Sequence, residues 1–232
     1  ATIQPTAPPS GALQVVSWGD TKDGLSSLAS LSPQASALNP LFTIYAGDLC
    51  GSGFSTNCIA PWKTAIGGLF NKTFAVRGNH DSSNPTGWSS YFNFRGVADS
   101  IGAKNYSGDN LTYSFDIGNV HMVGIDVTGD AGNMSTNNRS WMDADLTAAE
   151  GRGMTHSFLF WHGPVYPVAE HCCGDNSWVT AIINKHQSVS ATFHGHEHVY
   201  AYDHIDSSRY PNVTHPFEQF VTGDAGAGPN TC

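Results

Sequence analysis

Charged side chains are scarce in this chain, and basic ones are the scarcest. Asp, Glu, Lys and Arg make up 12% of the 232 residues, where a typical protein has ~25%. Ten Lys and Arg stand against 19 Asp and Glu, which gives a formal net charge of −9. Such a surface repels polyanions at long range, so we expect no binding to nucleic-acid polymers or to anionic membrane surfaces.

Long apolar runs and paired cysteine motifs are absent as well. No stretch approaches the ~20 apolar residues that a membrane span requires, so no span is predicted. None of the five cysteines forms a Cys-x-x-Cys pair, which argues against a cysteine-rich zinc site. Cys50 and Cys58 could close a short disulfide loop in an oxidising compartment. Either Cys172 or Cys173 could reach Cys232, or these two neighbours could bridge each other, and the sequence leaves these pairings open.

Sequons for N-glycosylation are frequent. The chain has six, at Asn71, Asn105, Asn110, Asn133, Asn138 and Asn212. Together with the low Lys content, they favour a glycoprotein of the eukaryotic secretory route. We therefore predict a secreted or extracellular protein, with the vacuole as the alternative compartment.

The length and the proline distribution suggest a simple organisation. Residues 1–12 contain three prolines and are predicted to form an extended N-terminal arm. Residues 13–232 are long enough to bury a core of their own and are predicted to form a single domain.

Five short apolar runs each lead into a residue that can bind a metal ion. The runs cover residues 13–18, 41–46, 73–76, 157–161 and 191–193. They lead into Asp20, Asp48, Asn79, His162, and the pair His196 and His198. Runs of this kind predict buried strands, and ligands in open α/β sheets bind just beyond the carboxyl ends of strands. One convergent site is therefore expected, with oxygen and imidazole ligands that suit Zn, Mn or Fe.

Helical and strand patterns alternate along the rest of the chain. Helices are predicted at residues 25–38 (interrupted near Pro33), 59–70, 141–149 and 177–186. Further strands are predicted at residues 112–116, 120–125, 198–205 and 217–222, the first two joined by a Gly118-Asn119 turn. Residues 84–109 are predicted to be irregular loops on the substrate side. The pattern alone indicates an α/β protein of two or more layers.

The order of the motifs resembles that of the calcineurin-like metallophosphoesterase superfamily. After the first Asp come Gly47-Asp48, Gly78-Asn79-His80-Asp81, a lone His162 and Gly195-His196-Glu197-His198. The resemblance implies a four-layered α/β/β/α sandwich with two mixed sheets and a dinuclear metal site at the carboxyl ends of strands. It also implies two divalent ions (Zn, Mn or Fe) as cofactors and a small phosphate ester as the substrate.

Roles for the metal ligands follow from the same resemblance. Asp48 is implied to bridge two metal ions, because two cations ~3.5–4 Å apart need an anion between them. Asn79, His162 and His196 are implied to complete one metal site. Asp20 and His198 are implied to complete the other. A hydroxide bridging the two ions is the implied nucleophile, because two metals lower the pKa of a bound water.

His80 and Asp81 are the implied catalytic pair. His80 would donate to the phosphate and protonate the leaving oxygen, while Asp81 would orient the imidazole and raise its pKa. A purely structural His–Asp pair is the alternative.

The chain departs from the family pattern in the first block and after the second Asp. Many members carry Asp-x-His where this chain has Lys22, and purple acid phosphatases supply a Tyr where it has Gly51. Lys22 could bind the substrate phosphate as a point charge, or it could be a solvated surface residue. His171 resembles a substrate-contacting His of plant purple acid phosphatases, although an exposed loop His is equally compatible. His194 is expected to pack in the core.

The function indicated is a secreted, metal-dependent phosphoesterase. It would hydrolyse phosphate mono- or diesters by in-line attack of a metal-bound hydroxide. The alternative is a degenerate scaffold that acts as a binding protein with weak or no catalysis, and the missing ligand in the first block motivates it.

Overall fold

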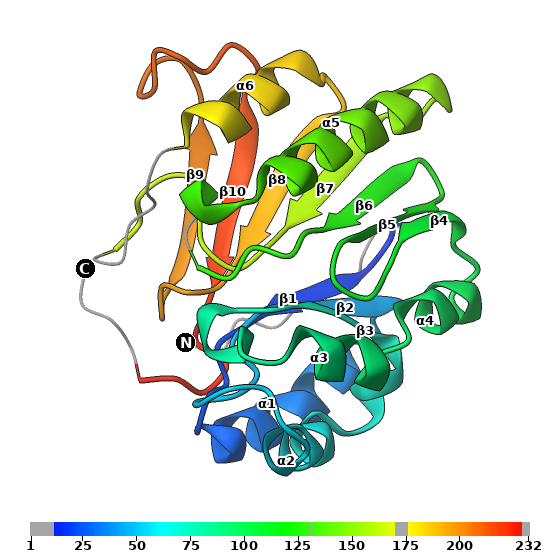
Figure 1. Ribbon diagram of the computed structural model, residues 1–232, viewed down its shortest axis with the longest axis vertical. Helices are drawn as coiled ribbons and strands as arrows, with labels where there is room; N and C mark the ends of the chain where they lie inside the picture. The colour runs from blue at the N-terminus through cyan, green and yellow to red at the C-terminus, as the bar shows by residue number, and fades with distance from the viewer. Residues whose placement is uncertain (1–11, 130, 170–175, 229–232) are drawn as a thin grey trace.

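The computed structural model describes residues 12–129, 131–169 and 176–228. Two helices cover a small sheet, the small sheet packs on a larger one, and two further helices cover the outer face of the larger sheet (Figure 1). This arrangement confirms the predicted α/β/β/α sandwich. Of the predicted N-terminal arm, residues 1–11 lie outside the described ranges. The same is true of His171, Cys172, Cys173 and Cys232.

The small sheet has three strands in the order β1-β2-β3 and is parallel throughout. Its strands are β1 (Val15–Trp18), β2 (Phe42–Ala46) and β3 (Thr73–Val76). Helices α1 (Leu25–Ala37) and α2 (Thr56–Ile66) connect them, and crossovers of this kind are what parallel strands require. The prediction of two mixed sheets is therefore wrong for this sheet, because both of its connections are helical crossovers.

The larger sheet has seven strands in the order β4-β5-β6-β7-β8-β10-β9 and is mixed. Antiparallel pairs lie at both edges, while β6, β7, β8 and β10 run parallel. The strands are β4 (Lys104–Gly108), β5 (Tyr113–Ile117), β6 (Val120–Gly124), β7 (His156–Phe160), β8 (Val189–His194), β9 (Tyr200–Ile205) and β10 (Phe217–Thr222).

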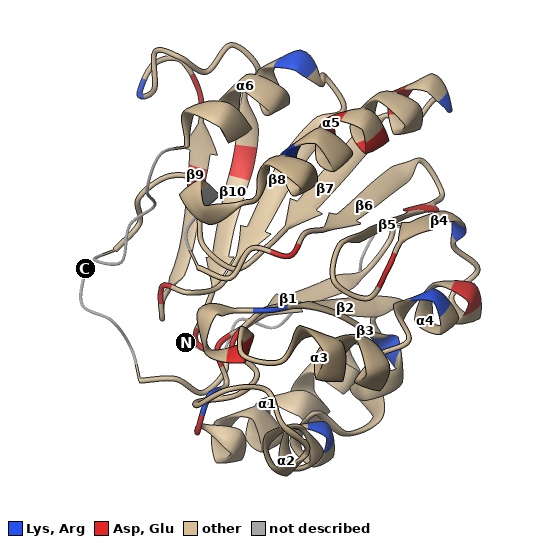
Figure 2. Ribbon diagram, viewed as in Figure 1, with Lys and Arg blue, Asp and Glu red and all other residues tan. Residues whose placement is uncertain are grey.

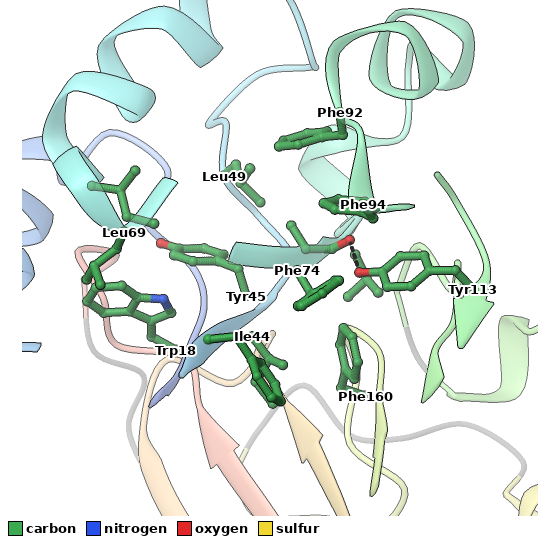
Figure 3. Close-up of a cluster of buried hydrophobic side chains, with 14 of the residues drawn as sticks. Trp18, Ile44, Tyr45, Leu49, Leu69, Phe74, Phe92, Phe94, Tyr113 and Phe160 are labelled. Carbon is green, nitrogen blue, oxygen red and sulfur yellow. Dashed lines mark hydrogen bonds between the residues drawn. The ribbon is translucent and has the colours of Figure 1, made fainter. Parts of the chain in front are cut away.

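Two hydrophobic cores hold the layers together. On one side of the larger sheet, α5 (Thr136–Gly151) and α6 (Ser177–Lys185) pack through residues such as Leu146 and Ile183. The other core lies between the sheets and under α1 and α2, and it is rich in aromatic rings (Figure 3). There the Tyr113 hydroxyl donates to the Ala75 carbonyl at 2.8 Å and ties the two sheets together.

Residues 84–109 are not irregular, which corrects the sequence prediction. They form α3 (Pro85–Tyr91), α4 (Phe94–Ser100) and β4. The side chains of Asn84 and Asn93 cap the two short helices by accepting from the Gly87 and Gly96 amides at 2.9 and 3.0 Å. Side-chain capping of this kind satisfies amides that would otherwise lack a partner.

Helix α1 also runs on through Pro33, where an interruption was predicted. Proline at this position removes the hydrogen bond to the Ala29 carbonyl. Ala29 is exposed, so water can satisfy that carbonyl. The described residues also form three short 3₁₀ segments: η1 (Gly67–Lys72), η2 (Asn79–Asp81) and η3 (Ala131–Asn133).

The predicted disulfide between Cys50 and Cys58 is present. It closes the loop that follows Asp48 onto the first turn of α2. None of the helices in the described part of the chain has the length and apolar character needed to cross a bilayer. Figure 2 shows Lys and Arg dispersed over separate elements.

The sequon asparagines differ in the hydrogen bonds that their side-chain amides make and in their exposure. Asn110 is the most constrained, because its amide nitrogen donates to the carbonyls of both Ser89 and Phe92, at 2.9 and 2.6 Å. A glycan on that nitrogen would replace one of these bonds. Four of the others are exposed: Asn71, Asn105, Asn133 and Asn212.

We expect Asp116 to be a major electrostatic contributor to stability. Its carboxylate accepts from Arg152 at 2.8 Å and from His121 at 2.6 Å. Burial opposes the charge, but the hydrogen bonds from Arg152, Asn105 and His121 outweigh it and hold the pKa of Asp116 below its usual value. A lowered pKa contributes stability that is present above the unfolded-state pKa and is lost as pH falls through the folded-state pKa.

Asp116→Asn should therefore lower the free energy of unfolding by about 3 kcal/mol at pH 7. The difference between the variant and the wild-type chain should shrink as pH falls below about 4, where the carboxyl of the unfolded chain takes up its proton. Urea denaturation across this pH range measures both effects. A pH-independent loss would show that shape, and not charge, makes Asp116 important.

Candidate metal centre

The six predicted metal ligands lie together where strands of the two sheets end. Asp20, Asp48 and Asn79 follow the three strands of the small sheet, and His162 and His196 follow β7 and β8. Asp20, Asp48 and His196 have positive φ values of 58°, 53° and 68°. Backbone in this region is costly for residues other than glycine, and such strain is concentrated at functional sites.

Glycines in the motifs let backbone pass directly beside the ligands. A Cβ on Gly78 would lie 2.0 Å from Asp48 Oδ1, and one on Gly195 would lie 2.2 Å from Asp20 Oδ2. Gly47 has a φ of 89°, and a Cβ there would lie 2.5 Å from His162 Nδ1. The Gly in each motif is therefore needed for steric reasons at the position where the sequence places it.

The two aspartates are fully buried, and each has one oxygen without a hydrogen bond. Asp48 Oδ1 accepts from the His80 amide at 2.9 Å, and Asp20 Oδ2 accepts from the His196 amide at 2.8 Å. Within the described residues, Asp48 Oδ2 and Asp20 Oδ1 are buried and accept no hydrogen bond. Burial and the nearby Asp48 raise the pKa of Asp20 well above its usual value. A buried carboxyl group of this kind is stabilised either by a proton or by a bound cation.

His162 presents an unprotonated nitrogen to the same space. Its Nδ1 lies 2.8 Å from the Ala46 carbonyl oxygen, which can only accept, so Nδ1 carries the hydrogen. Burial lowers the pKa of His162 and keeps the ring neutral. The lone pair of Nε2 then faces Asn79 Oδ1 at 2.9 Å and Asp48 Oδ1 at 3.5 Å. His162 Nε2, Asn79 Oδ1 and Asp48 Oδ1 are therefore three potential ligand atoms that lie close together.

His196 and His198 complete the centre. His196 Nδ1 lies 3.2 Å from His162 Nε2, and the two rings are 4.9 Å apart. His198 Nδ1 donates to the Gly228 carbonyl at 2.8 Å, and its Nε2 lies 3.6 Å from Asp20 Oδ1. An imidazole fixed through one nitrogen by a backbone carbonyl is typical of a metal ligand.

The donor set fits divalent ions. Ligand atoms of Asp20, Asp48 and His162 lie within 4.8 Å of one another. Asn79 and His196 contact Nε2 of His162, which lies beside Asp48, while His198 lies beside Asp20. Oxygen and imidazole donors of this kind suit Zn, Mn or Fe, and two adjacent half-sites that share Asp48 can be built from these residues.

Asp81 does not orient the His80 imidazole, which corrects the role expected from the sequence. Its oxygens accept from the backbone amides of Leu49, Cys50 and Gly78 at 3.0–3.1 Å. Burial, with Asp48 close by, raises the pKa of Asp81 to about 7. Asp81 therefore holds the two ligand-bearing loops together.

The partner of the His80 ring is a backbone carbonyl. His80 Nδ1 donates to the Gly51 carbonyl at 2.6 Å. This leaves Nε2 directed toward the metal centre, 4.0 Å from Asp48 Oδ2, on a side chain that is 36% exposed. A residue placed this way can contact both a substrate and the metal centre.

Lys22 also belongs to the centre. Its Nζ lies 3.5 Å from Asp48 Oδ2 and its side chain is 22% exposed, so it is not a freely solvated surface lysine. His194 packs in the core as expected: it is buried, its Nδ1 donates to the Trp161 carbonyl at 3.2 Å, and burial lowers its pKa to about 3.

Arg77 is a supporting residue that the sequence patterns did not single out. It forms a two-pronged ion pair with Asp126 at 2.9 and 2.7 Å and donates to the Ser82 carbonyl at 3.0 Å. These contacts bracket the Asn79–Asp81 turn. An Arg directly before Gly78, at the end of an apolar strand, was the available signal, since a buried charge needs a fixed partner.

Gly78→Ala should test whether the close approach is required. The added methyl group would collide with Asp48 Oδ1 and displace it, so we expect metal affinity to fall at least tenfold while the chain still folds. Gly68→Ala is the matched control, because nothing lies within 4 Å of a Cβ there. Isothermal titration calorimetry with metal measures the metal affinity of both variants. Unchanged metal affinity in Gly78→Ala would contradict the steric argument.

Comparisons with known proteins identify the family and similar folds. No curated protein matches the chain. Its fold resembles a dimetal phosphatase from Danio rerio, with a TM-score of 0.66 and 15% identity over 94% of this chain and 89% of that one. It also resembles a Thermus thermophilus protein, with a TM-score of 0.55 and 11% identity over 92% of this chain and 91% of that one. The sequence model of the calcineurin-like phosphoesterases matches residues 14–200, and the chain therefore belongs to that family.

Proposed function

We propose that this chain is a metal-dependent phosphoesterase that hydrolyses small phosphate mono- or diesters. One observation carries the proposal: ligand atoms of the buried residues Asp20, Asp48 and His162 lie within 4.8 Å of one another, and within the described residues one oxygen of each aspartate accepts no hydrogen bond. The Danio rerio structure, described as a dimetal phosphatase, supports the same reaction class.

The residues divide into two groups of ligands and one proton donor. Asp48, Asn79, His162 and His196 would hold one divalent ion. Asp20 and His198, with the second oxygen of Asp48, would hold another. When bound, such ions supply positive charge against the phosphate and a water molecule of lowered pKa as the nucleophile.

His80 would deliver the proton to the leaving oxygen. The bond from Nδ1 to the Gly51 carbonyl fixes the ring, so that Nε2 faces the centre. A protonated Nε2 can donate to a phosphate oxygen and transfer its hydrogen as the ester bond breaks. Asp81 would support proton transfer by His80 only indirectly, because it accepts from the backbone amides of Leu49 and Cys50 in the loop that contains Gly51.

We further propose that the protein is secreted and N-glycosylated. The disulfide between Cys50 and Cys58 favours an oxidising compartment. The exposed sequons at Asn71, Asn133 and Asn212 are the better acceptors, because the amide nitrogen of Asn105 donates to Asp116 at 2.7 Å. Lys22 and His171 are proposed to help hold the substrate phosphate, His171 from a segment outside the described residues.

Turnover of two model esters tests the proposal. The chain is stripped with a chelator, reloaded with Mn²⁺, Zn²⁺ or Fe²⁺, and assayed with p-nitrophenyl phosphate and bis-p-nitrophenyl phosphate. We expect metal-dependent hydrolysis of at least one, and the ratio of the two rates decides between monoester and diester preference. Metal binding without any turnover would support the degenerate binding protein instead.

A further inference from the structure

The backbone directs Lys22 into the centre. Lys22 follows Asp20 by two residues, has a φ of 46°, and donates its amide to the Asp48 carbonyl at 3.1 Å. A left-handed conformation is unfavourable for Lys and persists only when the surroundings impose it. The long side chain thereby turns toward Asp48.

The ammonium group lies against the oxygen that a second metal ion would use. Lys22 Nζ is 3.5 Å from Asp48 Oδ2, and within the described residues this oxygen is buried and accepts no hydrogen bond. The other oxygen, Oδ1, lies 3.5 Å from His162 Nε2. The ammonium and the His162 side of the centre therefore face different oxygens of one carboxylate.

The two half-sites are unequal in donors. The half-site of His162 has Asp48, Asn79 and His196 as its further donors. In the part of the chain that the structure describes, the half-site of Asp20 has His198 and the shared Asp48 as its donors, and the Lys22 ammonium lies beside Asp48. A divalent ion that enters the half-site of Asp20 would have to displace the Lys22 ammonium group or bind beside it. Two positive charges that share one carboxylate repel each other strongly.

We infer that the Lys22 ammonium is the resident second cation of this centre. The wild-type chain would then bind one divalent ion tightly, in the half-site of His162, and a second one only weakly. Lys22 would supply fixed positive charge where a second ion would otherwise do so. This inference rests on the proposed function, because it concerns how the same centre is charged.

Counting bound Mn²⁺ tests the inference without measuring turnover. Equilibrium dialysis of the metal-free chain is followed by metal analysis of the wild type, Lys22→Met, Lys22→His and the control Lys104→Met. Lys104 is exposed and lies on β4 in the larger sheet. Circular dichroism checks that every variant is folded.

We expect the wild type and Lys104→Met to bind one Mn²⁺ per chain, with a second only at much higher concentration. Lys22→Met removes the positive charge and should raise the affinity for the second Mn²⁺ by about tenfold or more. Lys22→His also adds a donor, and it should bind two ions that show the magnetic coupling of a pair ~3.5–4 Å apart in electron paramagnetic resonance.

Other outcomes would overturn the inference in distinguishable ways. Two ions of equal affinity in the wild type would contradict it and leave the proposed function standing. Identical Mn²⁺ isotherms for the wild type and Lys22→Met, with weaker binding of inorganic phosphate in the variant, would make Lys22 a phosphate-binding residue only. Failure of the wild type to bind Mn²⁺, Zn²⁺ or Fe²⁺ would remove the proposed function as well.

Discussion

Replacing Asp48 by Asn should weaken all metal binding and lower hydrolysis by about 10³-fold or more. The substitution preserves the shape of the side chain and removes the negative charge that the two half-sites share. Asp48 is fully buried and central, with His162, His80 and Lys22 all within 4.0 Å of its oxygens. Metal analysis and turnover of p-nitrophenyl phosphate, on the same preparation, measure the two effects.

The control for Asp48→Asn is Asp99→Asn, which makes the same change on an exposed residue of α4. It should leave both metal content and turnover unchanged. An Asp48→Asn variant that kept its metal and most of its activity would show that Asp48 is not the shared ligand.

His80→Ala should leave metal content intact and lower turnover by about 10²–10⁴-fold. The loss should be larger for esters with poor leaving groups, because those depend most on protonation of the leaving oxygen. A good leaving group such as p-nitrophenolate needs less help, so the loss there should be smaller. The measurement is kcat for a series of aryl and alkyl phosphates, compared between the wild type and the variant.

His156→Ala is a suitable control for His80→Ala, because His156 is exposed and bonds to Ser190 across β7 and β8. An equal loss for every leaving group would assign His80 to phosphate positioning. A joint fall in thermal stability and metal content would instead indicate the structural role considered as the alternative.

The sequence indicated that the candidate ligands would converge, because their signal is local. Each ligand follows a short apolar run, and the carboxyl ends of neighbouring strands necessarily meet. The partners of the ligands were harder to predict. His80 bonds to the carbonyl of Gly51, 29 residues away along the chain, and backbone carbonyls carry no sequence signature. The adjacent Asp81 was the natural guess, and it was wrong for that reason.

The errors in secondary structure have similar causes. Helices α3 and α4 are only seven residues long, too short for a periodic pattern, and they depend on the caps of Asn84 and Asn93. The helices predicted at residues 25–38 and 59–70 already favoured parallel crossovers in the smaller sheet, and the expectation of a mixed sheet did not use them. Which strands pair, and in which direction, depends on the whole fold. Buried strands and the residues at their ends depend mainly on the local run of apolar residues.

The disulfide loop links the redox state of the surroundings to proton delivery. Gly51 lies in the loop that the disulfide between Cys50 and Cys58 closes. The carbonyl of Gly51 accepts from Nδ1 of His80 and so fixes the hydrogen on that nitrogen. A thiol reductant would open that loop without touching any metal ligand. The orientation of His80, the proton donor proposed above, would then depend on oxidation, so a reduced preparation is expected to transfer protons poorly.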